Sequence, residues 1–248
     1  MWNLRQKLMI RQKFTSILLA LAFLSARASA QSWEEALNTM PLLQETRQLT
    51  RTNCVRVMLE AFQSNAVVKG LVFMPGATDE FYMFRRARAN LTNAHPTLLD
   101  AVNALTNQTF IRATFHPPLV LLHTDEDPLE PLFKIEDEAA LQRLEASHFV
   151  SHARYNDRDW NFMQPILRKA LKASVLPWVQ SFDSWHFYRH SFAGWNLTGR
   201  EAVQAIALAG KTKVTVSRSS KLSWHKFELR FEPDERVRAT PHLDEFPR

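Results

Sequence analysis

The chain has 248 residues, with 31 lysine or arginine residues against 25 aspartate or glutamate residues and a formal net charge of +6. Five of the basic residues and none of the acidic ones lie in the first 30 positions, so removing that segment leaves 26 basic residues against 25 acidic ones. A chain so close to neutrality is not expected to bind nucleic acid through its charge.

Residues 1–30 have the pattern of a secretory signal peptide. A basic beginning is followed by an apolar run over 17–24 and by the small residues Ala28, Ser29 and Ala30, which predict cleavage after Ala30. The apolar run is far shorter than the ~20 residues that a membrane-spanning helix needs. We therefore expect an exported protein, periplasmic or extracellular, without a transmembrane segment after cleavage. An uncleaved membrane anchor is the alternative.

Cys54 is the only cysteine. An intramolecular disulfide and a thiolate metal cluster are both impossible with one thiol. We expect Cys54 to be a buried, small apolar residue, so the core must hold the exported chain together.

The first predicted elements after the signal peptide are helical. Residues 31–50 form a helical segment in which Ser32 can cap a helix that begins at Trp33. A first module spans 51–130, and its apolar residues predict a helix around 55–62.

The rest of the first module alternates between extended and helical patterns. Apolar residues at helical spacing predict a helix over 98–105, with Pro96 at its first position and His95 as its cap. Two strands follow, over 109–115 and 119–122.

The segment 131–159 connects two modules. Its acidic part, residues 132–147, predicts a helix, and residues 152–159 predict a polar loop.

A second module is predicted over 160–236. It contains a helical segment around 166–171 and a second helix, for which Thr198 and Glu201 form a capping box and Gly210 marks the end.

The second helix leads into two more extended patterns. Strands are predicted over 212–216 and 222–231, and residues 237–248 form a C-terminal tail.

The two modules resemble each other at a spacing of about 104 residues. Residues 79–92 have the sequence DEFYMFRRARANLT and residues 183–198 the sequence DSWHFYRHSFAGWNLT. Aspartate, alternating large apolar residues, arginine and Asn-Leu-Thr recur in the same order. Fixed-period similarity indicates an internal repeat, with chance similarity as the alternative.

The predicted fold class follows from this repeat. Each copy has the order strand, helix, strand, strand, so we expect an α+β protein with two tandem βαββ-type modules and connecting helices. The pattern leaves open whether the modules share one core or have two.

Residues 196–202 and 206–216, with the sequences NLTGREA and IALAGKTKVTV, carry a resemblance to a known family. They resemble the small βαβ modules in the short N-terminal domains of bacterial secretins and TonB-dependent receptors. The likeness covers about 35 residues of each copy. It implies a periplasmic binding or docking module and no catalytic activity.

The predicted binding residues lie on the aromatic first strand of each copy. His186, Tyr188 and His190 share one face of a strand because side chains alternate along it. Arg189 lies beside them and corresponds to Arg85 in the first copy. Simple core packing is the competing explanation for the aromatic residues of this strand.

Two chemical motifs are weaker than they first look. His186 and His190 have the spacing of a metal-ligand pair, but a third ligand such as His225 would have to come from another strand. Residues 209–212, Ala-Gly-Lys-Thr, follow a helix and have Ala205 where a phosphate-binding loop needs glycine. We therefore predict no metal, no cofactor and no nucleotide site.

The sequence contains no recognisable catalytic motif. Asp183, Ser184 and His186 are near neighbours on one predicted strand, so they point to both of its faces and cannot form a triad by themselves.

The functional prediction is therefore an exported, non-enzymatic binding or scaffold protein of the cell envelope. Its expected partner is another envelope or secreted protein, bound by strand addition at a sheet edge. The alternative is a secreted hydrolase that uses the histidine-rich face of the second module.

Overall fold

Helices and mixed β-sheets together confirm the predicted α+β class in the computed structural model. Residues Trp33–Arg248 form one compact unit. The predicted signal peptide and the C-terminal tail lie outside the described residues. The structure describes residues 31–43, 46–50, 53–74, 88–123, 133–146, 152–158, 163, 165, 167, 175–179, 190–210, 212–218 and 227–233.

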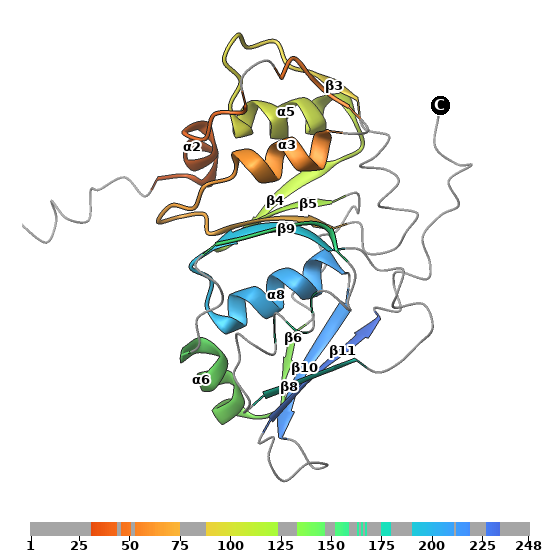
Figure 1. Ribbon diagram of the computed structural model, residues 1–248. Coiled ribbons are helices and arrows are strands. Elements are labelled where there is room, and N and C mark those ends of the chain that lie inside the picture. Colours follow the sequence, from red (N-terminus) through yellow and green to blue (C-terminus); the bar gives the residue numbers. More distant parts are fainter. Residues whose placement is uncertain are drawn as a thin grey trace, which may run out of the picture. The chain divides into compact units, whose positions relative to one another are not determined.

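The larger sheet has five strands in the order β4-β5-β2-β9-β7 (Figure 1). β2 is parallel to β5, and all other neighbours in the sheet are antiparallel. In sheet order the strands are β4 (Arg112–His116), β5 (Leu119–His123), β2 (Gly70–Met74), β9 (His190–Trp195) and β7 (His152–Arg158).

The central strands of this sheet are covered on both faces. β2 is buried along its whole length, and its successive side chains point to opposite faces. Leu71 and Phe73 belong to one buried cluster, and Val72 and Met74 belong to another. A strand that is buried on both faces is a continuous apolar run, and both β2 and β5 have that character.

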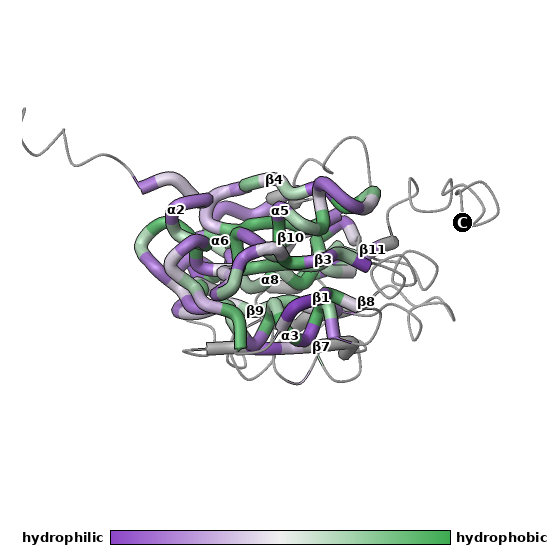
Figure 2. Tube along the Cα trace, turned by 90° about the horizontal axis from the view of Figure 1, so that it is seen from above, coloured by the Kyte–Doolittle hydropathy of each residue, from purple (hydrophilic) through white to green (hydrophobic). Residues whose placement is uncertain are grey.

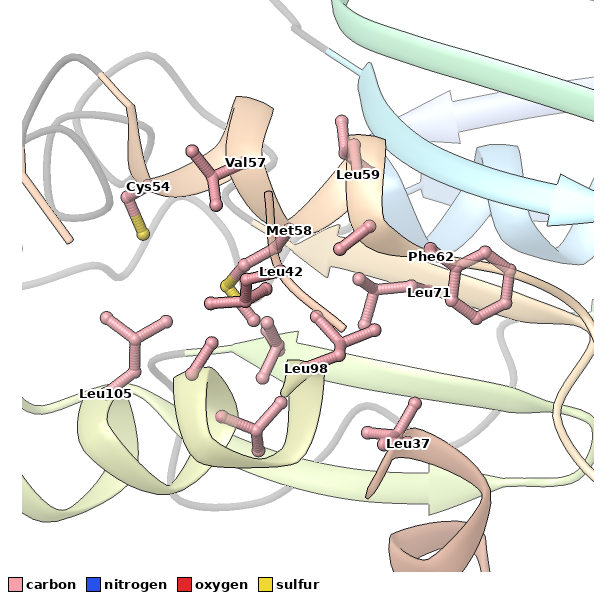
Figure 3. Packing of buried hydrophobic residues seen from close by; sticks show 14 of the residues in the cluster. Leu37, Leu42, Cys54, Val57, Met58, Leu59, Phe62, Leu71, Leu98 and Leu105 are labelled. Carbon is pink, nitrogen blue, oxygen red and sulfur yellow. The ribbon is translucent and has the colours of Figure 1, made fainter. Parts of the chain in front are cut away.

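Among the described residues, three helices cover the first face of the sheet: α2 (Trp33–Asn38), α3 (Cys54–Ala61) and α5 (Leu98–Gln108) (Figure 1). Their buried side chains meet Leu71 and Phe73 in a cluster that we call the α3/α5 core. Figure 3 shows Leu37, Phe62, Leu71 and Leu98 among the side chains that converge there.

Helix α8 (Gly199–Ala209) covers the second face and lies between the two large sheets (Figure 1). Eight of its eleven residues are buried, as expected for a helix with protein on several sides. Figure 2 shows that α8 is more hydrophobic than α2, which is mainly hydrophilic. The cluster around α8, which includes Val72, Met74 and Phe192, is called the α8 core.

The second large sheet has four strands in the order β6-β10-β11-β8. Val214, Val216, Leu229 and Phe231 project from it into the α8 core, which also contains residues of α6 (Glu138–Ala146). A two-stranded sheet joins β1 (Gln48–Leu49) to β3 (Ala89–Asn90). The strands of the four-stranded sheet are β6 (Phe133–Ile135), β10 (Thr212–Arg218), β11 (Phe227–Pro233) and β8 (Val175–Val179).

The longest helices begin at matching capping boxes. The predicted box of Thr198 and Glu201 is confirmed, with both reciprocal hydrogen bonds present. In α5 the cap is Thr97, whose side chain accepts from the Asp100 backbone amide. The prediction of His95 as the cap was wrong, because Thr97 offers a hydroxyl acceptor and Asp100 completes the box.

The two predicted modules share a pairing pattern. β5 is antiparallel to β4 and parallel to the earlier β2, while β11 is antiparallel to β10 and parallel to the earlier β8. However, β9, which covers part of the predicted first strand of the second copy, pairs with β2. The five-stranded sheet therefore combines strands from both predicted modules, and the duplication itself stays a prediction.

Two expectations for the connecting segment need correction. Residues 152–158 form strand β7, not a polar loop, because the free edge of β9 supplies a hydrogen-bonding partner for this polar segment. The acidic helix is shorter than predicted: the chain first forms β6, parallel to β10, and α6 starts only at Glu138.

Cys54 lies in the α3/α5 core with 1% of its surface exposed, as predicted. Burial raises the pKa of its thiol from 9.0 to about 12. The unfolded chain therefore loses this proton above pH 9 while the folded chain keeps it, so stability falls as pH rises towards 12.

We expect Cys54→Ala to remove this alkaline loss. Between pH 8 and pH 10 the free energy of unfolding of the wild type should fall by about 1.4 kcal/mol more than that of the variant. Urea denaturation of both proteins at the two pH values measures the difference. Parallel pH profiles for the two proteins would show that the thiol titrates normally in the folded state.

Candidate functional site

Four of the five predicted binding residues, Arg85, His186, Tyr188 and Arg189, lie outside the described residues. The fifth, His190, is the first residue of β9 and is completely buried. β9 is an interior strand between β2 and β7, and His190 lies at the end of the sheet where β2 finishes.

The imidazole of His190 lies against the end of α8. A Cβ added at Gly210, the C-cap of α8, would be 2.7 Å from His190 Nε2 and 3.3 Å from Cδ2. Glycine at this position therefore lets the helix end approach the ring closely. His190 faces the α8 side of the sheet, as does Phe192 two residues later in the same strand.

A second buried histidine lies at the same end of the sheet. His123 is the last residue of β5, has 1% of its surface exposed and pairs with Met74 at the end of β2. Thr114 Oγ1 lies 3.3 Å from His123 Nε2. Because Leu121 belongs to the α8 core, His123, two residues later, faces the same side.

The register places both histidines in one row. β2 and β9 pair from Gly70 and Gly194 to Phe73 and Ser191, so the next position brings His190 opposite Met74. Because His123 pairs with Met74 from the other side, the centre of the row is His123, Met74 and His190. The row continues to Arg112 of β4, opposite His123, and to Arg158 of β7, opposite His190. Neighbouring strands are ~4.8 Å apart, so adjacent side chains in this row are in contact range.

The row lies at the ends of β2 and β5, and the next described helices after these two strands lie on opposite faces of the sheet. The next described helix after β2 is α5, in the α3/α5 core, whereas the next after β5 is α6, in the α8 core. Adjacent parallel strands with diverging connections form a topological switch point, where open α/β sheets place their ligands.

Sequence reasoning missed His123. The predicted strand ended at Leu122, one residue before it. The available signal was its position at the end of a buried strand, but only the parallel pairing with β2 places it near His190.

A different kind of site is offered by β4, the end strand of the five-stranded sheet. Its five residues pair with β5 without a register shift. Phe115 of this strand stacks on Trp33, with ring centroids 6.2 Å apart. Phe110, just before the strand, is a large apolar side chain with 54% of its surface exposed.

The other end strands are poor templates for strand addition. β7 has a register shift between Tyr155 and Arg158, and β8 contains Pro177, which has no backbone N–H. β6 has only three residues. Irregularity, proline and shortness are the devices by which sheet edges avoid pairing, and β4 has none of them.

No three His, Cys, Asp or Glu side chains in the described ranges lie close enough to hold a metal ion together. The helices described by the structure are all too short or too polar to cross a membrane. A comparison with known proteins found no matching family, no matching curated protein and no matching solved structure.

Proposed function

We propose that the protein is an exported, non-enzymatic binding protein that recognises another envelope or secreted protein by adding a strand to the β4 edge. The observation that carries this proposal is the regular, uninterrupted β4 at the end of the sheet, beside the exposed Phe110. A partner strand there would extend the sheet through main-chain hydrogen bonds, with Phe110 as an apolar anchor.

The chemistry of the edge favours this mode of binding. Ala113 and Phe115 pack against the α3/α5 core, so one face of β4 is fixed to the rest of the protein. Main-chain bonds supply affinity in strand addition, and the side chains of alternate residues supply specificity. The resemblance to short N-terminal domains of secretins and TonB-dependent receptors supports a docking role in the envelope.

Site-specific photo-crosslinking in the native host tests the partner surface. A photoreactive phenylalanine analogue at position 110 should give a discrete crosslinked product. The matched control is Leu43, which is 52% exposed and lies near the other end of α5, where Leu42 donates a backbone hydrogen bond to Pro96. Crosslinking from Leu43 as strong as that from Phe110 would contradict docking at the β4 edge.

Two further measurements complete this test. Slower amide hydrogen exchange in Ala113–His116 on addition of the purified partner is expected if the partner forms a strand there. Export requires that the protein recovered from the host outside the cytoplasm begin at Gln31. An intact first residue Met1 in that fraction would contradict cleavage.

The rival hypothesis, a secreted hydrolase, depends on the histidine-rich face. Ser191, the hydroxyl residue next to His190, points to the opposite face of β9, so the two cannot act together as base and nucleophile. A panel of hydrolase substrates tested with the wild type and His190→Asn separates the two functions. Turnover that the substitution abolishes would favour the hydrolase.

A further inference from the structure

The buried row of His123, Met74 and His190 is not used by the proposed partner surface and carries an inference of its own. The two imidazoles and the thioether come from three neighbouring strands and face the same side of the sheet. All three residues have at most 1% of their surface exposed. A site so enclosed suits a small ion better than an organic ligand, which needs a cleft.

The kinds of ligand atom in the row select among metals. Imidazole binds zinc, copper, iron and nickel, whereas a thioether is a soft ligand that favours copper(I). Carboxylate oxygens would favour magnesium, calcium or manganese, but the row itself contains none. Two nitrogen donors and one sulfur donor therefore match copper(I) better than zinc.

The surroundings of the row can orient these ligands. Thr114 Oγ1, 3.3 Å from His123 Nε2, can hydrogen-bond one ring nitrogen, as second-shell partners of metal-binding histidines do. Gly210 lets the end of α8 close over His190. Helix carbonyls carry partial negative charge at this end and favour a nearby cation.

We propose that His123, Met74 and His190 bind one copper(I) ion at the switch point between β2 and β5. The site lies on the face opposite to the α3/α5 core, and its three ligands come from β5, β2 and β9 rather than from the partner surface at β4. His190 would then be a metal ligand. Its partner ligand His123 is a residue that the sequence pattern did not single out.

Anaerobic competition with a chromogenic copper(I) chelator tests the proposal on the full-length chain. The wild type is expected to bind one copper(I) per chain. Met74→Leu should weaken copper(I) binding by at least about 10-fold, the lower end of the effect of losing even an outer-shell partner. His123→Asn and His190→Asn should do the same.

Two substitutions serve as matched controls. Met58→Leu removes a fully buried thioether from the α3/α5 core, and His95→Asn removes an exposed imidazole. Neither should change copper(I) affinity. Met74→Leu and Met58→Leu nearly conserve volume, and such core substitutions usually cost less than about 1.5 kcal/mol, so folding persists even if a histidine variant fails to fold.

X-ray absorption of the copper(I) complex identifies the atoms bonded to the metal, and a change in protein stability would not alter that result. A copper–sulfur distance is expected in the wild type and should disappear in Met74→Leu. No copper(I) binding by the wild type, or equal affinity of wild type and Met74→Leu, would overturn the proposal. Zinc binding that Met74→Leu leaves unchanged, with no preference for copper(I), would also overturn it.

Discussion

Phe192→Ala is expected to lower the free energy of unfolding by about 3–5 kcal/mol, the usual cost of removing a buried phenylalanine ring. Phe192 is completely buried in the α8 core and pairs with Val72 on one side and Tyr155 on the other. Its ring lies 5.1 Å from that of Tyr155. Removing the ring would therefore leave a cavity at the centre of the sheet.

The same substitution tests whether the sheet joins the two cores. β2, β5 and β9 each contribute residues to both the α3/α5 core and the α8 core. We therefore expect one cooperative urea transition, shifted to lower concentration, with the same midpoint by tryptophan fluorescence and far-UV circular dichroism. Phe110→Ala, at an exposed site, is the control and should stay within about 0.5 kcal/mol. Two separate transitions would show independent domains.

Gly210→Ala should lower the free energy of unfolding by about 1–3 kcal/mol through overpacking against His190. The backbone of Gly210 does not require glycine, because its φ of −93° is accessible to alanine. Alanine at such a position would ordinarily stabilise by reducing the entropy of the unfolded chain. Destabilisation would therefore isolate the contact between the new Cβ and the imidazole, 2.7 Å away in the structure.

A double-mutant cycle makes this prediction specific. His190→Ala removes the ring that the new Cβ would meet, so the cost of Gly210→Ala should disappear or change sign in that background. Thermal and urea unfolding of the four proteins gives the coupling energy. Equal costs of Gly210→Ala in both backgrounds would show that His190 does not pack against the end of α8.

Local sequence signals predicted several elements well. The helix at 98–105, the strands around 109–115 and 119–122, and the capping box of Thr198 all depend on residues close together in the chain, and all are present. The predicted position of the α5 cap was wrong because Pro96 and Thr97 offered competing local signals. Proline fits the first turn, but only a side-chain oxygen satisfies an amide of that turn.

The predicted site could be recognised only in part. His190 was singled out for its aromatic and basic neighbours, whereas the described structure places it at the buried end of an interior strand, in the same row as Met74 and His123. The intervals between these three residues have no periodicity that a local pattern could detect. Strand β7 was not predicted for a related reason: its polar residues form a strand because they pair with β9.

By itself the sequence determined the α+β class, both ends of α8 and the burial of Cys54, because propensity, capping and apolar spacing act between residues near in the chain. The tertiary structure alone decided that β9 joins β2, that β4 ends the sheet and that two distant histidines flank one methionine. Strand pairing depends on which edges remain open after the rest of the chain has packed, and that competition between distant segments leaves no local mark on the sequence.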